Sequence, residues 1–388
     1  MSMSKKLVHQ TVLKNAQYVA KQLTYIPPIA AKHINGQFEL LENSMQSRKS
    51  TIMGMFCIRP LSSAFNSDTL SRINCATAQE CGICGDLDWV YNIAGHDGGR
   101  LISNGNSLDA YRLALHYGVS DAVIVGSNTV SKEGINQANY LGYLWQPYYV
   151  CQWNQLYSID NHLEEEIKNQ RQAWQSLGYI STTRDYPAQI VFSRSGDCYD
   201  SSSDFLAARM FHECHPNGER IEAYIMTSKK GAERIRTRAY RYNLHDRIDD
   251  ILIVLPSSPS STGAHADEDP LSMDIASVPN MLYENYDMRL VNHDGGHNVL
   301  QAFWQAGALT QLHLTLGCKR SVLDVMREHG HDTFAPVCSY FFNQPAAVSD
   351  FPRAIPPDMR VVSAISDSEG EVLLLTFKPD SSLNYSVQ

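Results

Sequence analysis

MRLVNHDGGHNVLQAFWQAGALTQLHLTL, residues 288–316, carries the clearest pattern of secondary structure in the chain. An apolar pair leads into His293-Asp294-Gly295-Gly296, after which apolar residues recur at helical spacing up to Gly307. Residues 312–316 then alternate apolar and polar side chains, as in a strand. The order strand, glycine pair, helix, strand predicts two parallel strands, because a connection through one helix favours parallel pairing.

The glycine pair lies where this helix is predicted to begin. The first N–H groups of a helix have no partner within it and carry partial positive charge. Glycine has no Cβ, so an anion can approach its backbone closely. A phosphate or pyrophosphate suits such a turn, although a glycine pair is also typical of a plain tight turn.

Composition limits the classes of function. The chain has 388 residues, 43% of them hydrophobic, which is enough to bury a large core. A net charge of −9 argues against a nucleic-acid partner, and no apolar run is long enough to span a membrane. The first ten residues lack the apolar block of a secretory signal, so we expect a cytoplasmic protein that keeps its nine cysteines reduced.

Two more segments ahead of this stretch read as strands followed by glycine turns. Residues 88–94, DWVYNIA, read as a strand, and His96-Asp97-Gly98-Gly99-Arg100 follows them; a helix capped by Ser107 is then predicted to run to Gly118. Residues 121–130 read DAVIVGSNTV, whose unbroken apolar run is typical of a strand covered on both faces. In open α/β sheets, ligands collect at such strand ends.

The remaining elements are predicted from the same patterns. We expect a helix at 159–177, a terminal hairpin built from 361–362 and 372–377, and further strands at 190–193, 223–227 and 251–255. Residues 135–187 read as an insertion, and their aromatic-rich part, 140–157, would either stack on a heterocycle or form core or dimer contacts.

Two segments carry chemistry of weaker specificity. Ser228-Lys229-Lys230-Gly231 follows the strand predicted at 223–227, where it would neutralise a phosphate or form a solvated turn. Residues 1–84 read as an N-terminal extension of unclear role, with Cys75, Cys81 and Cys84 as either free thiols or three ligands of a zinc site. The His-x-Glu of zinc-dependent nucleobase deaminases is missing upstream of these cysteines.

The stretch from about residue 89 to 377 resembles the reductase domain of riboflavin biosynthesis, the C-terminal domain of bifunctional deaminase-reductases. Residues 94–102 are similar to the family's Ser-x-Asp-Gly-(Lys/Arg)-Ile with one glycine added, and 121–130 are similar to Asp-Ala-(hydrophobic)3-Gly-x-x-Thr-Val. Residues 294–297 followed by 306–309 and His313-Leu314 are similar to its late Glu-Gly-Gly-Pro, Ala-Gly-Leu and His-Leu.

The resemblance implies an α/β, dihydrofolate-reductase-like fold over residues 85–388, with a mixed, mostly parallel central sheet flanked by helices. It implies a homodimer that uses NADPH to reduce a small-molecule substrate, a ribosylaminopyrimidine phosphate or related heterocycle, by hydride transfer to the ribosylamine C1. The residues it assigns to the cofactor are Gly126, Ser127, Thr129, Ser228, Lys229, Gly295, Gly296, His297 and Asn298. Those it assigns to the substrate and catalysis are Asp97, Arg100 and Asp294.

The chain departs from the family pattern at substrate-side positions. Asp294 stands where the family has glutamate, His297 replaces proline, and the serine ahead of Asp97 is lost. These changes leave a second hypothesis open, namely a non-catalytic protein that binds a nucleotide or another ligand and retains the reductase fold.

Overall fold

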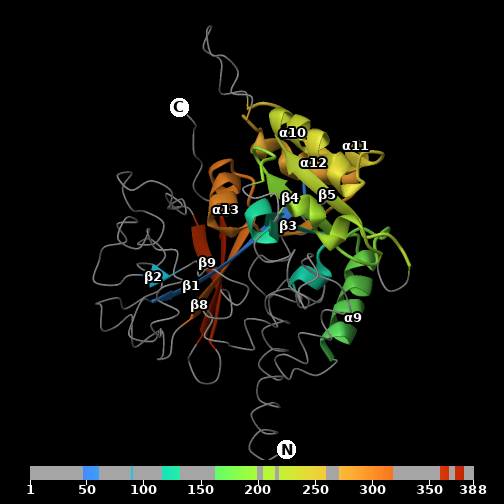
Figure 1. Cartoon of the computed structure of the whole chain (residues 1–388). Coiled ribbons are helices and arrows are strands. Elements are labelled where there is room, and N and C mark those ends of the chain that lie inside the picture. Colours follow the sequence, from blue (N-terminus) through green and yellow to red (C-terminus); the bar gives the residue numbers. More distant parts are fainter. Residues whose placement is uncertain are drawn as a thin grey trace, which may run out of the picture.

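One mixed sheet forms the centre of the computed structural model, which describes residues 47–60, 89–90, 116–131, 162–198, 204–214, 218–258, 271–317, 359–366 and 372–379 (Figure 1). Its strands are β1 (Thr51–Pro60), β2 (Trp89–Val90), β3 (Ala122–Gly126), β4 (Ala188–Ser193), β5 (Ala223–Thr227), β6 (Leu252–Val254), β7 (Leu290–Asp294), β8 (Gln311–Gly317), β9 (Met359–Ser366) and β10 (Val372–Pro379).

The strand order is β6-β5-β4-β3-β7-β1-β8-β10-β9, with β2 paired to β1. The strands from β6 to β8 run parallel, whereas β10 is antiparallel to both β8 and β9. The predicted mixed, mostly parallel sheet is therefore confirmed. The predicted terminal hairpin is confirmed as β9 and β10.

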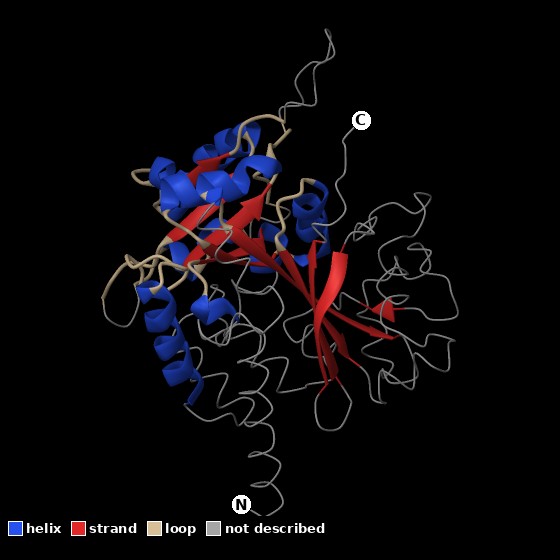
Figure 2. Cartoon of the chain, turned by 180° about the vertical axis from the view of Figure 1, so that it is seen from behind, coloured by secondary structure: helices blue, strands red, loops and turns tan. Residues whose placement is uncertain are grey.

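Helices cover both faces of the sheet, which explains the unbroken apolar run in β3. Ile124 belongs to a core with α12 (Val278–Tyr286) and α13 (Gly296–Gln305) on one face. Val125 belongs to a second core with α10 (Lys229–Ala239) and α11 (Ile248–Ile251) on the other. In Figure 2 the described helices gather around one half of the twisted sheet, and the strands of the other half continue beyond them.

Strand β1 corrects the boundary expected from the sequence. Residues 51–60 lie between β7 and β8, with Met53 paired to Asn292 on one side and to Gln311 on the other. The sheet therefore includes a strand that the sequence assigns to an N-terminal extension ending at residue 84. Cys75, Cys81 and Cys84 lie outside the described residues.

Several predicted elements keep their expected places. Strand β5 covers the predicted residues 223–227, and α9 (His162–Ser176) ends two residues before Gly178, whose φ is 74°. Strand β6 is shorter than predicted, and Val254 is 39% exposed because β6 is an edge strand. The aromatic residues 140–157 lie outside the described residues, as does most of 88–115.

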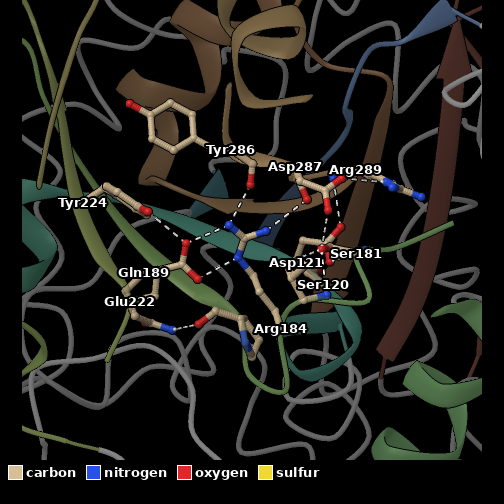
Figure 3. Close-up of polar contacts among 12 residues, drawn as sticks. Ser120, Asp121, Ser181, Arg184, Gln189, Glu222, Tyr224, Tyr286, Asp287 and Arg289 are labelled. Atoms are coloured by element: carbon tan, nitrogen blue, oxygen red, sulfur yellow. Dashed lines mark hydrogen bonds and ion pairs between the residues drawn. The ribbon is translucent and has the colours of Figure 1, made fainter. Parts of the chain in front are cut away.

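Polar side chains form hydrogen bonds and ion pairs at the edge of the sheet where β3, β4, β5 and β7 begin (Figure 3). The fully buried Asp121 carboxylate accepts backbone N–H bonds from Ser181 at 2.9 Å, Arg289 at 2.8 Å and Leu290 at 3.1 Å. Arg171, from α9, donates to the carbonyl oxygens of Gly118 and Ser120, just ahead of β3. The start of β3 is thereby fixed against the start of β7.

Arg184 binds the same edge from the loop before β4. Its guanidinium makes two 2.7 Å bonds to the Glu222 carboxylate and also donates to the carbonyl oxygens of Tyr286 and Asp287 (Figure 3). Burial and the Glu222 carboxylate raise the pKa of Tyr224, so its hydroxyl stays protonated and donates to Glu222 at 2.9 Å. The polar side chains of this edge are thus used to hold the strands and loops together.

Candidate functional site

The two glycine turns predicted from separate parts of the sequence lie side by side. Strands β3 and β7 are parallel neighbours, with Val125 opposite Asp294, so both chains turn at the same edge. A Cβ added to Gly126 would lie 3.0 Å from the carbonyl oxygen of Gly295. The turns are therefore in backbone contact, and glycine at position 126 permits that contact.

Helix α13 begins at this contact without a side-chain cap. Its N-cap is Gly295, which has no side chain that could accept from the first N–H groups of the helix. Gly296 has φ of 69°, and a Cβ built on it would meet no atom within 4 Å. Uncapped N–H groups beside open space suit an anionic ligand, because the helix dipole favours negative charge there.

His293, the residue before Asp294, forms a hydrogen bond with the backbone of Gly295. Its Nδ1 accepts the N–H of Gly295 at 3.4 Å, and its ring lies 4.5 Å from the ring of Phe303, centroid to centroid. The imidazole is fully buried, and this burial lowers its pKa to about 4. It is therefore neutral at pH 7. No local sequence pattern marks it as part of the site, although alternation along β7 puts it on the same face as Val291.

Asp294 ends β7 on the opposite face from His293. Its side chain is half-buried and accepts a hydrogen bond from the hydroxyl of Tyr117. Tyr117 belongs to the helical residues 116–119, which precede β3. The sequence places Asp294 at the site but gives no sign of Tyr117, because the contact joins residues 177 positions apart.

The turn after β3 forms the short helix α7 (Ser127–Thr129). Ser127 and Thr129 are half-buried, Asn128 is exposed, and the buried Val130 packs into the core beneath. The predicted Ser127 and Thr129 therefore sit directly beside the contact between Gly126 and Gly295. Asp97, Arg100 and the side chains of His297 and Asn298 lie outside the described residues.

The predicted Ser228 and Lys229 lie two strands away, at the end of β5. The Ser228 hydroxyl is buried; it donates to the carbonyl oxygen of Arg194 at 2.7 Å and accepts the N–H of Gly231 at 3.0 Å. Ser228 thus caps α10 and joins it to the end of β4. Lys229 is exposed at the same helix start. Of this pair, Lys229 is the one whose charged group faces solvent.

No helix among the described residues has the length and apolar character to cross a membrane. No group of three or more His, Cys, Asp and Glu side chains in the described ranges is placed to hold a metal ion. Within those ranges the contact between Gly126 and Gly295 is the strongest candidate for a ligand site.

Known proteins resemble this chain in structure. No protein-family model matches the chain, and no curated protein matches it. A pyrimidine reductase-like protein of Corynebacterium diphtheriae is similar over 93% of this chain and 98% of its own, at 16% identity and a TM-score of 0.43.

Two structures from riboflavin biosynthesis are similar at lower scores. RibD of Acinetobacter baumannii matches 87% of this chain and 60% of its own at 12% identity, with a TM-score of 0.38. The riboflavin biosynthesis reductase Rib7 of Saccharomyces cerevisiae matches 89% of this chain and 99% of its own at 9% identity, with a TM-score of 0.34.

Proposed function

We propose that this protein is an NADPH-dependent reductase of a ribosylaminopyrimidine phosphate or a related small heterocycle. The observation that carries the proposal is the backbone contact between Gly126 and Gly295, made by two turns at neighbouring strand ends. The motifs at residues 121–130 and 294–297, which resemble those of riboflavin-pathway reductases, contain these same turns.

The residues around this contact fit a dinucleotide. The start of α13 would bind a pyrophosphate, since its N-cap glycine has no side chain to occupy the first N–H groups and Gly296 is exposed. The half-buried Ser127 and Thr129 would add hydroxyl groups from the neighbouring turn. The exposed ammonium group of Lys229 would bind the 2′-phosphate, two strands further along the same edge.

Bound NADPH would supply a hydride to the C1 of the ribosylamino group, opened to an imine. The chain's own contribution is orientation and charge. The Asp294 carboxylate, at the end of β7, would stabilise the positive charge of the imine. The hydroxyl of Tyr117 holds that carboxylate in place, so it fixes the direction from which the carboxylate acts.

Titration with NADPH, followed by nucleotide fluorescence, tests the cofactor assignment. We expect saturable binding, with weaker binding of NADH because it lacks the 2′-phosphate. Absence of any nicotinamide nucleotide binding would contradict the proposal.

A second measurement separates a reductase from a non-catalytic binding protein. With a ribosylaminopyrimidine phosphate as substrate, the wild-type protein should oxidise NADPH steadily, and Asp294→Asn should bind NADPH normally but turn over at least tenfold more slowly. Glu233→Gln, at an exposed position on α10, serves as the control and should match the wild type. NADPH binding without turnover in the wild type would favour the binding protein.

A further inference from the structure

Arg171 joins α9 to the short helix at residues 116–119 through its buried guanidinium. Arg171 is 5% exposed, and its Nη1 donates to the carbonyl oxygens of Gly118 at 3.1 Å and Ser120 at 2.6 Å. Its Nη2 donates to the carbonyl oxygen of Arg184 at 2.8 Å. The last carbonyl groups of a helix have no partner within it and carry partial negative charge, so a cation there stabilises the helix end. Arg171 therefore fixes where this short helix ends.

The same short helix brings Tyr117 to Asp294. Residues 116–119 end beside the start of β3, and the side chains of a helix lean toward its N-terminus. The ring of Tyr117 is therefore directed back along the sheet, and its hydroxyl donates to the carboxylate of Asp294 at the far end of β7. Tyr117 is 3% exposed. This buried phenol connects the edge where the strands begin with the candidate site at the edge where they end.

The position of the short helix depends on its tertiary contacts. A helix of one turn is not stable by itself, because too few hydrogen bonds offset the cost of ordering its backbone. The ring of His116 lies 4.4 Å from the ring of His313 on β8, centroid to centroid, and the Ser120 hydroxyl donates to the carbonyl oxygen of His116 at 2.6 Å. Arg171 adds two bonds from a different element, α9. A shift of the helix end would move the hydroxyl of Tyr117 with it.

We propose that Arg171 is a positioning residue for the reaction, which orients the Asp294 carboxylate through Gly118 and Tyr117. The inference rests on the proposed function, in which Asp294 stabilises the positive charge of the imine. Such stabilisation depends on geometry, and a misplacement of about 1 Å can lower a rate about 100-fold. Helix α9 belongs to residues 135–187, which the sequence marks as an insertion. The insertion thereby contributes to the site, although Arg171 lies at the opposite edge of the sheet.

Carbon-13 NMR of protein labelled at the tyrosine Cζ tests this coupling without requiring turnover. The Tyr117 signal is identified as the one missing in Tyr117→Phe. Asp294→Asn then shows how the signal moves when a neutral amide replaces the carboxylate that accepts from the hydroxyl. Arg171→Met should move the Tyr117 signal in the same direction. Arg171→Lys keeps a charged donor near the helix end, so its Tyr117 signal should lie between those of the wild type and Arg171→Met.

Kinetics separate positioning from a general loss of structure. With NADPH and a ribosylaminopyrimidine phosphate, Arg171→Met should lower kcat at least tenfold and leave the KM for NADPH within twofold of the wild type. Arg171→Lys should recover most of the lost kcat. In the Asp294→Asn background, Arg171→Met should lower kcat less than twofold, because the effects of residues that act through one group do not add.

Arg184→Met is the matched control. Arg184 lies at the same edge and also donates to backbone carbonyl oxygens, those of Tyr286 and Asp287. Its guanidinium bonds go to these carbonyl groups and to the Glu222 carboxylate, and not to the short helix that carries Tyr117. Its replacement should lower the melting temperature and leave the Tyr117 signal and kcat unchanged.

Two results would overturn the inference. One is an unchanged Tyr117 signal in the folded Arg171 variants; the other is an equal loss of kcat from Arg171→Met in the wild type and in Asp294→Asn. If Arg171→Met does not fold, Arg171→Lys is measured for the same changes at smaller size. Failure of the proposed function gives a different result. The Tyr117 signal would still respond to Arg171 while the wild type oxidised no NADPH, so the coupling would stand and the reductase assignment would fall.

Discussion

Gly126 and Gly295 are in backbone contact, although one ends β3 and the other precedes α13, far along the chain. A Cβ on Gly126 would lie 3.0 Å from the Gly295 carbonyl oxygen and 3.5 Å from a methyl group of Val299. Backbone cannot move aside as a flexible side chain does. Any side chain at position 126 must therefore displace the turn that leads into α13.

Gly126→Ala tests this relationship. We expect it to weaken NADPH binding by about tenfold, or about 1.4 kcal/mol, since it pushes the uncapped start of α13 out of place. Fluorescence titration measures this change.

Gly307→Ala, at the other end of α13, is the control: its φ of 65° strains an alanine, but a Cβ there meets no atom within 4 Å. It should reduce stability by about 1 kcal/mol without affecting NADPH binding. Equal affinities in both variants would contradict the prediction.

His293 makes stability depend on pH. Burial lowers its pKa from the ordinary 6.5 to about 4, so between these values the unfolded chain binds a proton that the folded chain does not. The contribution of neutral His293 to the free energy of unfolding should be fully present above pH 6.5. It should fall as the pH drops toward 4, by roughly 3 kcal/mol in all. Urea unfolding at pH 7 and pH 4.5 measures the difference.

His293→Asn isolates that contribution, because its side-chain oxygen can replace Nδ1 as the acceptor for Gly295 but does not titrate. The variant should lose less stability between pH 7 and pH 4.5 than the wild type. An unchanged pH dependence in the variant would mean that other groups are responsible.

Ser228 and Lys229 should separate into a structural and a binding residue. Ser228→Ala removes the cap of α10 and the bond to Arg194, so we expect a loss of about 1–2 kcal/mol in stability with the ratio of NADPH to NADH affinity unchanged. Lys229→Ala should reduce that ratio and leave stability within about 0.5 kcal/mol of the wild type. A changed ratio of NADPH to NADH affinity in Ser228→Ala would mean that the Ser228 hydroxyl takes part in binding the 2′-phosphate.

Asp121→Asn probes the opposite edge of the sheet. It replaces a buried carboxylate that accepts three backbone N–H bonds and removes one of the two negative neighbours of the buried Arg171, so about 3–5 kcal/mol of stability should be lost. Asp249→Asn is the matched control, since its carboxylate binds Arg236 but is 72% exposed. There the loss should stay below about 1 kcal/mol. Chemical unfolding of both variants tests the contrast.

The sequence predicts those parts of the fold whose signal is local. Residues 122–126 and 223–227 are continuous apolar or β-branched runs, and the stretch around Gly295 and Gly296 carries a strand, a turn and a helix in one short segment. The segment of β1, TIMGMFCIRP, is also mostly apolar, but nothing in its local pattern indicates that it lies between β7 and β8. Its place is determined by distant partners.

The same distinction applies to the site. The turns at Gly126 and Gly295 could be predicted to meet, because the carboxyl ends of parallel strands share an edge. The roles of Tyr117 and His293 depend on tertiary contacts and burial, which no local pattern reports. Ser228 had the right position for a ligand, but its hydroxyl is used by the backbone around it.

The central position of β1 also constrains how the chain acquires its structure. The amide of Ile52 reaches a partner on Thr310, 258 positions later, so the ribosome completes most of the protein before β1 can pair with β7 and β8. Contacts of such separation slow folding and leave apolar strands unprotected in the meantime. The nascent chain would then depend on chaperones until β7 and β8 emerge, and a truncation before β7 would yield aggregates instead of a smaller folded unit.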